Sequence, residues 1–304
     1  MNEHTKPRIG FIGIGNMGAP MAANLVRAGY AVIAYDVAAE RARTFAAEHS
    51  AQATASLANL GKSADVIITM LPSGHEVRHV LLKAENGALA ANLKAGSIVI
   101  DMSSAAPVGT RALGAELGAS GLALVDAPVS GGVVRAKDGS LTIMIGGDAE
   151  AVTSVKPILA AMGQKLFEVG TLGCGHALKA LNNFLAATSF AAATEAARVG
   201  RQFGLDPAVM MDVISVSTGR SFATEMMIKQ HVLSGVFGTG FALGLLAKDV
   251  KIAADLADEI GVEAPVVELV SEMWSEARDA LGGDRDHTRA ALHWEQKGLR
   301  RAAE

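Results

Sequence analysis

The stretch that decides the fold of the first half of the chain reads Arg8-Ile9-Gly10-Phe11-Ile12-Gly13-Ile14-Gly15-Asn16-Met17-Gly18. An apolar run typical of a buried strand is followed directly by a GxGxxG pattern and a helix-like segment, 17–28. In this motif the glycines permit a tight turn, a close backbone approach to a pyrophosphate, and packing of the helix on the strand. The free backbone N–H groups at the start of the helix can donate hydrogen bonds to the pyrophosphate. We therefore expect a dinucleotide to bind at Gly13, Ile14, Gly15, Asn16, Met17 and Gly18.

The acid that this motif requires is Asp36, which ends the next strand-like segment, 31–35, about 20 residues downstream. Its carboxylate would accept hydrogen bonds from the adenosine ribose and repel a 2′-phosphate, which favours NAD over NADP. Arg41 and Arg43 lie nearby and would tolerate a phosphate, so NADP stays open as the second choice. Asp36 also suits the N-cap of a helix over 38–48, and the two roles are compatible.

Strand-like and helix-like segments alternate throughout the first half. The strands that we predict are apolar on both faces, as in a sheet covered by helices on both sides, and lie over residues 8–12, 31–35, 65–69, 97–100, 123–125, 141–145 and 165–169. This alternation predicts a doubly wound parallel sheet. From about Gly175 only helical periodicity remains. We therefore predict an α/β domain over residues 1–172 and an all-α domain over residues 173–304.

The composition excludes several classes of partner. The 304 residues carry a net charge of −4 and only 4% aromatic side chains, so neither a nucleic acid nor an anionic membrane surface is expected as a partner. The most apolar long stretch, 177–199, contains Lys179, Asn182, Asn183 and Glu195, which favours a buried helix over a membrane span.

The single cysteine and the N-terminus bear on the compartment. Cys174 has no partner for an internal disulfide, and we expect a small buried thiol in a reducing environment. The polar segment 1–8 leads directly into the first strand, so no secretory signal is expected, and we predict a cytoplasmic location. The histidines show no metal-ligand spacing, so no metal is expected, and His176 is interpreted as a satisfied surface residue.

A first group of candidate chemical residues is Ser130, Gly131 and Gly132, in the loop after the strand 123–125. In an open α/β sheet, ligands bind beyond the carboxyl ends of the strands. A hydroxyl and unobstructed backbone N–H groups suit a carboxylate. Taken alone, the run is equally well explained as a plain turn.

A second group is Lys179 and Asn183, which share one face of an apolar helix at i and i+4. Such polar groups are costly on an apolar helix unless they meet a partner. Lysine can donate a proton or stabilise the alkoxide that hydride transfer to a carbonyl leaves. A salt-bridged lysine and a capping amide at a domain joint explain the pair equally well. Lys248-Asp249 is a further polar pair in an apolar helical stretch, and an exposed helix face is its plainer interpretation.

Together these motifs resemble the β-hydroxyacid dehydrogenase family, which includes 3-hydroxyisobutyrate dehydrogenase and tartronate semialdehyde reductase. The resemblance covers nearly the whole chain, in order. It is carried by Phe11–Leu25, Met70-Leu71-Pro72, Asp101-Met102-Ser103-Ser104 with Ser104 in place of the usual Thr, Asp126–Gly132, Gly175-x-x-x-Lys179-x-x-Asn182-Asn183, and Lys248-Asp249.

The resemblance implies a fold and a set of roles. The fold is a Rossmann domain, a long interdomain helix and an all-α domain that usually mediates formation of a homodimer or homotetramer. Lys179 would be the catalytic acid and base. Ser130, Gly131, Gly132 and Asn183 would hold the hydroxy acid, Lys248 would contact both substrate and cofactor, and the cofactor would also contact Leu71, Pro72 and Ser104.

The substrate stays open at this point. A 3-hydroxyisobutyrate-like acid is the first expectation, and tartronate semialdehyde, succinic semialdehyde, glyoxylate, threonate or glycerate are alternatives within the family. Imine reductases share the architecture but usually lack the lysine, so Lys179 favours alcohol–carbonyl chemistry. A non-catalytic NAD-binding module is disfavoured because Lys179, Asn183 and the Ser130 loop are all present.

Overall fold

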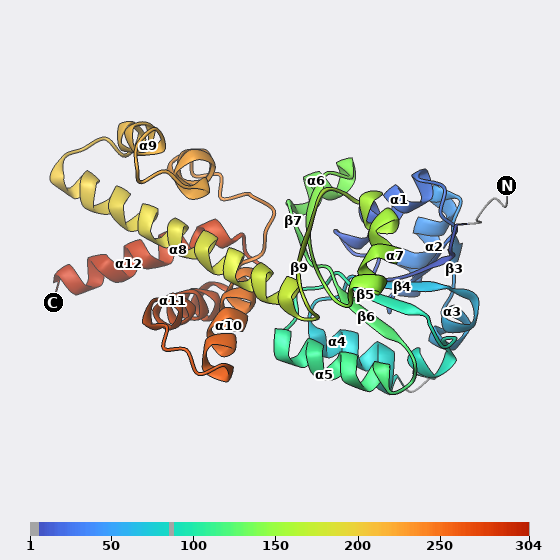
Figure 1. Ribbon diagram of the computed structural model, residues 1–304. Helices are drawn as coiled ribbons and strands as arrows, with labels where there is room; N and C mark the ends of the chain where they lie inside the picture. The colour runs from blue at the N-terminus through green and yellow to red at the C-terminus, as the bar shows by residue number, and fades with distance from the viewer. Residues whose placement is uncertain (1–5, 85–87, 304) are drawn as a thin grey trace. The chain divides into compact units, whose positions relative to one another are not determined.

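The computed structural model of the chain describes residues 6–84 and 88–303, with side chains described as far as residue 297 (Figure 1). Residues 1–5 of the polar N-terminal segment lie outside the described part. Contacts divide the chain into two compact units, Met1–Lys179 and Ala180–Glu304.

The first unit is built on one sheet, in which the described residues form nine strands. Six of them are parallel, in the order β3-β2-β1-β4-β5-β6. This is the strand order of a dinucleotide-binding fold, and it confirms the predicted Rossmann sheet. Their bounds are β1 Ile9–Ile12, β2 Val32–Tyr35, β3 Gln52–Ala53, β4 Val66–Thr69, β5 Ile98–Asp101 and β6 Ala123–Asp126.

Beyond β6 the sheet is mixed rather than parallel. The strand β8 (Leu141–Gly146) runs antiparallel to β6 and to the short β7 (Val129–Ser130), and β9 (Gly163–Gly170) runs parallel to β8. The two residues of β7 are too few to give a periodic signal, which is why sequence patterning does not find this strand. The Ser130 loop is therefore the end of a paired strand rather than a free turn.

Helices cover both faces of the sheet (Figure 1). Neighbouring strand residues enter different cores: Ile67 and Val99 pack into one cluster, and Ile68 and Ile100 into the other. This explains why the strands are apolar without alternation. The helical segments of the first unit are α1 Gly18–Arg27, α2 Ala39–His49, α3 Leu57–Ser63, α4 Gly74–Arg78, η1 His79–Lys83, η2 Ala90–Asn92, α5 Pro107–Gly118, α6 Gly132–Asp138 and α7 Ala149–Ala160.

The long helix α8 (Cys174–Phe203) contains the boundary between the units. The rest of the second unit is helical, with no strand among its described residues: α9 Pro207–Ser215, η3 Ala223–Leu233, α10 Leu243–Glu259, α11 Pro265–Leu281, η4 His287–Arg289 and α12 Ala290–Ala303. Its core is organised around Phe190, Trp274 and Trp294. In the described residues no helix is long and apolar enough to cross a membrane.

Candidate active site

The GxGxxG turn of the first unit is shaped by close backbone contacts. Gly13 donates to Tyr35 O at 2.9 Å and has φ +98°, and a Cβ added to it would lie 2.3 Å from Met70 O. A Cβ on Gly18 would lie 1.8 Å from Gly13 O. Both positions therefore require glycine, one for the turn and one for the packing of α1 against β1.

Gly15 differs from these two glycines because nothing lies within 4 Å of the place where its Cβ would be. The helix α1 that follows has no side-chain cap at Met17. The open space over Gly15 and the uncapped helix start fit a pyrophosphate, which would accept hydrogen bonds from these N–H groups. This chain's own geometry therefore suits a dinucleotide at the predicted place.

Asp36 closes the turn from the neighbouring strand. Its buried carboxylate accepts hydrogen bonds from the backbone N–H groups of Ile14, at 2.8 Å, and Ala38, at 2.9 Å. The N-cap of α2 is Ala38, so Asp36 is not the cap itself. Arg41 approaches the same carboxylate at 3.9 Å. Burial, with a smaller contribution from the charge of Asp36, raises the pKa of Tyr35 above its ordinary value.

The segments expected to line the cofactor follow β4 and β5, whose carboxyl ends meet at the same edge of the sheet. Met102 N donates to Thr69 O at 2.9 Å, which aligns the two strand ends. Beyond them, the backbone N–H of Leu71 donates to Ser103 Oγ at 3.0 Å. Pro72 and Ser104 each follow one of these residues in the chain. The turn at Leu71 and the segment ending at Ser104 are thus joined directly.

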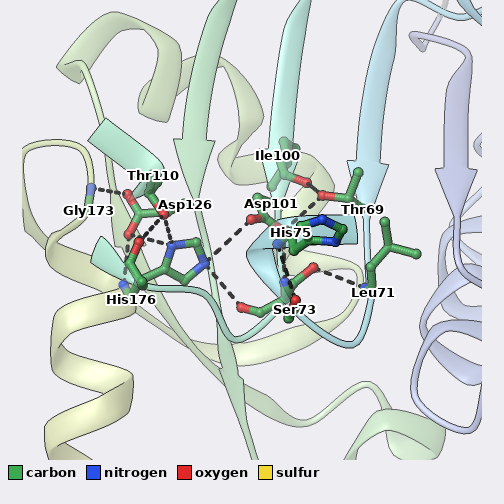
Figure 2. A network of polar contacts seen from close by, with 12 residues as sticks. Thr69, Leu71, Ser73, His75, Ile100, Asp101, Thr110, Asp126, Gly173 and His176 are labelled. Carbon is green, nitrogen blue, oxygen red and sulfur yellow. Dashed lines mark hydrogen bonds and ion pairs between the residues drawn. The ribbon is translucent and has the colours of Figure 1, made fainter. Parts of the chain in front are cut away.

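Two buried carboxylates stand at the ends of β5 and β6 (Figure 2). Asp101 accepts hydrogen bonds from the hydroxyl of Thr69 at 2.9 Å and from Ser103 N at 3.0 Å. Asp126 accepts from Gly173 N at 2.7 Å and from His176 N at 2.8 Å. Asp126 therefore fixes the start of α8 from the end of β6.

The side chain of His176 connects these strand ends to α5 (Figure 2). Its Nε2 lies 3.1 Å from Ser103 O and its Nδ1 lies 2.8 Å from the hydroxyl of Thr110. The carboxylates of Asp101 and Asp126 stand at 3.8 and 3.9 Å from the ring nitrogens. With 1% of its surface exposed, His176 is a core residue, and its interpretation as a surface residue is wrong.

The packing around Asp126 requires small residues. A Cβ on Gly146 would lie 2.5 Å from Asp126 Oδ1, and one on Gly175 would lie 2.4 Å from Met144 O. Cys174, expected to be buried, is half-buried instead, with Thr171 Oγ1 at 3.8 Å and Arg111 Nη2 at 3.9 Å from its sulfur. Its position at the first residue of α8, rather than inside the helix, accounts for this exposure.

Of the predicted substrate residues, two groups belong to the first unit. Lys179 is the last residue of this unit and is partly buried, three residues after His176 on α8. Ser130 pairs with Thr142 at the end of β7, while Gly131 and Gly132 have φ values of +133° and +65°. Asp126 is linked to both groups. It is the last residue of β6, four residues before Ser130, and its carboxylate binds the backbone N–H of His176, three residues before Lys179.

The other predicted residues meet within the second unit. Asn183 Nδ2 donates to Asp249 Oδ2 at 2.7 Å, and Lys248 Nζ lies 3.2 Å from Asp249 Oδ1. Asn183 and Asp249 are both buried, so Asn183 is not a helix-capping amide. The structure thus unites Asn183 and Lys248 through Asp249, which the sequence analysis noted only as the neighbour of Lys248. In the described residues, no group of three or more His, Cys, Asp or Glu side chains could hold a metal ion.

Comparisons with known proteins cover both units. The sequence model described as the NAD binding domain of 6-phosphogluconate dehydrogenase matches residues 8–170. The model described as the NAD-binding domain of NADP-dependent 3-hydroxyisobutyrate dehydrogenase matches residues 173–294. The chain belongs to the β-hydroxyacid dehydrogenase family. The family identification confirms the resemblance inferred from the motifs.

Individual relatives agree with this assignment. The chain is 36% identical to the 2-(hydroxymethyl)glutarate dehydrogenase of Eubacterium barkeri, over 95% of both chains. It is 34% identical to the NAD-dependent L-serine dehydrogenase of Pseudomonas aeruginosa, over 88% of this chain and 91% of the relative. The structure of Mycobacterium tuberculosis 3-hydroxyisobutyrate dehydrogenase with L-serine superimposes with a TM-score of 0.88, at 31% identity, over 95% of this chain and 99% of that one. As a member of this family, the chain is an NAD(P)-dependent oxidoreductase.

Proposed function

We propose that this β-hydroxyacid dehydrogenase oxidises the terminal hydroxyl of a small acid of the form HO–CH2–CH(R)–COO−, or reduces the corresponding aldehyde, with NAD. The three relatives named above support this class. 3-Hydroxyisobutyrate, L-serine and 2-(hydroxymethyl)glutarate share this skeleton and differ only in R. Glycerate and its aldehyde, tartronate semialdehyde, belong to the same class with R = OH. Succinic semialdehyde, glyoxylate and threonate lie outside it and remain the alternatives to be tested beside it.

The observation that carries the proposal is the attachment of α8 to the strand ends of the first unit. Asp126 binds two N–H groups at the start of the helix. Lys179 follows His176 by three residues, which is about 4.5 Å along a helix axis and nearly one turn. The lysine is therefore anchored near the carboxyl edge of the sheet, where the turns at Gly13 and Leu71 also lie.

Lys179 is the acid and base of the proposed reaction. In oxidation its neutral amine takes the proton of the substrate hydroxyl, and in reduction its ammonium returns that proton to the forming alkoxide. A bound nicotinamide cofactor would supply the hydride acceptor for oxidation of the carbon that bears this hydroxyl, and the hydride donor for the reverse reaction. In the first unit, the Ser130–Gly132 backbone is the proposed binding site for the substrate carboxylate. In the second unit, Asn183 and Lys248 are the proposed substrate-binding residues, and Lys248 supplies a positive charge beside Asp249.

Replacing Lys179 tests this role. In Lys179→Ala, turnover should fall at least about 100-fold, the lower range for general acid–base catalysis, while NADH binding followed by fluorescence persists. Lys165→Ala is the matched control, because Lys165 is an exposed lysine of the same unit, and it should leave turnover unchanged. Wild-type turnover in Lys179→Ala would end the proposal.

The substrate class has its own test, in which initial rates are compared for the named acids and aldehydes with NAD and NADP. We expect the highest kcat/KM with an acid that has the HO–CH2–CH(R)–COO− skeleton. A preference for glyoxylate, which has no CH(R) group, would contradict the proposed class.

We further propose a cytoplasmic homodimer or homotetramer. The described surface of the second unit exposes large apolar side chains, among them Phe203 at 85% and Val216 at 86%. Exposed apolar side chains mark an interface where they form one contiguous patch, and we propose that those of the second unit do so. Light scattering coupled to gel filtration should give two or four chains per particle, and a monomer at micromolar concentration would contradict this proposal.

A further inference from the structure

The imidazole of His176 lies at the junction of three chain segments and is used by none of the steps above. It contacts Ser103 O beyond β5 and Thr110 on α5, while its own backbone N–H is held by Asp126 at the end of β6. His176 and its three partners, Ser103, Thr110 and Asp126, are all buried in the first unit. A buried polar group with this many partners fixes local geometry strongly.

We infer that His176 is a positioning residue that sets the place of Lys179 relative to the turn at Leu71. This inference rests on the proposed role of Lys179. Residues three apart on a helix are neighbours on one face, so a fixed ring at position 176 fixes the rotation of the turn that carries Lys179.

A short path of hydrogen bonds joins this ring to the cofactor side. The backbone N–H of Leu71 donates to Ser103 Oγ at 3.0 Å, and Ser103 O lies 3.1 Å from His176 Nε2. One residue, Ser103, therefore connects the turn that is expected to line the nicotinamide cofactor with the helix of the proposed catalytic lysine. A change at His176 would move one relative to the other.

The same contacts argue against His176 as an acid or base. A carbonyl oxygen only accepts, so Nε2 must carry a hydrogen that it donates to Ser103 O. Nδ1 is hydrogen-bonded to the hydroxyl of Thr110. The oxygen of this hydroxyl also lies 3.1 Å from Ala106 O. Both ring nitrogens are engaged, and neither is left to exchange a proton with a substrate.

The first experiment compares His176→Leu and His176→Gln, each alone and combined with Lys179→Ala. A glutamine amide can replace the Nε2 donor to Ser103 O, whereas leucine cannot. We expect kcat to fall about 10- to 100-fold in His176→Leu, as for a displacement of about 1 Å, and NADH affinity to change less than about 3-fold. His176→Gln should recover most of kcat.

The Lys179→Ala background distinguishes positioning from a general loss of structure. If His176 acts through Lys179, then His176→Leu should cause no further fall in the residual turnover of Lys179→Ala, because the two effects are not additive. An equal fold loss in both backgrounds, or full turnover in His176→Leu, would overturn the inference. Full turnover in Lys179→Ala alone would instead overturn the proposed function.

A milder variant keeps the test decisive if His176→Leu does not fold. Thr110→Val removes only the hydroxyl that holds Nδ1. We expect kcat to fall about 5-fold in the wild-type background, since one hydrogen bond contributes about 1 kcal/mol, and not to fall in Lys179→Ala. Thr153→Val is its control, because the exposed Thr153 hydroxyl also donates to the carbonyl four residues back, at 2.7 Å, but on a different helix, α7. A loss as large in Thr153→Val, or no loss in Thr110→Val, would contradict the inference.

Discussion

The glycine turn after β1 and the anchor of α8 serve the same edge of one sheet by opposite means. The turn is made from one continuous stretch, 13–18, and works through backbone groups and absent side chains. The anchor is made from separate segments, joined by the side chains of Asp101, Asp126 and His176. The glycine turn depends on the absence of side chains, whereas the anchor of α8 depends on several polar side chains that must all be present. Substitutions should therefore affect the two regions differently.

The largest effect is expected in the glycine turn. A Cβ on Gly18 would lie 1.8 Å from Gly13 O, so Gly18→Ala should lower the free energy of unfolding by at least about 3 kcal/mol, at the upper end of overpacking costs. Chemical denaturation measures this loss. NADH binding should be lost with it.

Gly15→Ala separates binding from stability within the same turn. Because the space over Gly15 is open, the methyl group should leave stability nearly unchanged and weaken NADH binding at least about tenfold, or about 1.4 kcal/mol. Unchanged binding in Gly15→Ala would contradict the placement of the pyrophosphate there.

A smaller effect is expected at the anchor. Asp126→Asn leaves one oxygen for two backbone donors, Gly173 N and His176 N, so one buried N–H loses its acceptor. The free energy of unfolding should fall by about 2 kcal/mol. Asp148→Asn is the control, because Asp148 caps α7 with a single oxygen, and it should cost less than about 0.5 kcal/mol. Equal losses in the two variants would contradict the anchoring role of Asp126.

An effect on cofactor choice rather than on stability is expected at Asp36, which accepts a hydrogen bond from Ile14 N of the glycine turn. Asp36→Asn removes the negative charge that would face a 2′-phosphate and leaves Arg41 nearby. The ratio of kcat/KM for NADP to that for NAD should rise at least about tenfold, since facing like charges cost several kcal/mol. Glu40→Gln, at an exposed acid paired with Arg43, should leave the ratio within about 2-fold. An unchanged ratio in Asp36→Asn would show that cofactor choice is made elsewhere.

The continuous features of the first unit could be predicted from the sequence. The parallel strands other than β3, the glycine turn and Asp36 follow from local patterns, because each pattern lies within one segment. The strand β3 was not predicted, because its two residues give no periodic signal. The strand β7 could not be predicted, because its two residues show no periodicity. Its antiparallel pairing with β8 could not be predicted either. The cap of α8 could not be predicted, since its first turn is capped by Asp126 from another segment rather than by a neighbour in sequence.

The polar network could not be predicted for the same reason. Nothing near His176 in sequence shows that Ser103 and Thr110 lie against its ring. The sequence did contain one signal for the contact between Asp126 and α8. Asp126 is an acid at the end of a strand, and the glycine-rich start of α8 has no polar cap of its own. Asn183 and Lys248 were found as separate motifs, but their union through Asp249 required the structure.

The capping of α8 from β6 has a consequence for how the chain is made. The carboxylates of Asp101 and Asp126 enter the protein well before Gly173 and His176 are synthesised. Until then Asp126 lacks both backbone donors that hold it, and a charged group cannot be buried cheaply without them. A fragment that stops after the last strand would retain that penalty permanently, so an expression fragment of the first unit should extend through the opening turns of the long helix.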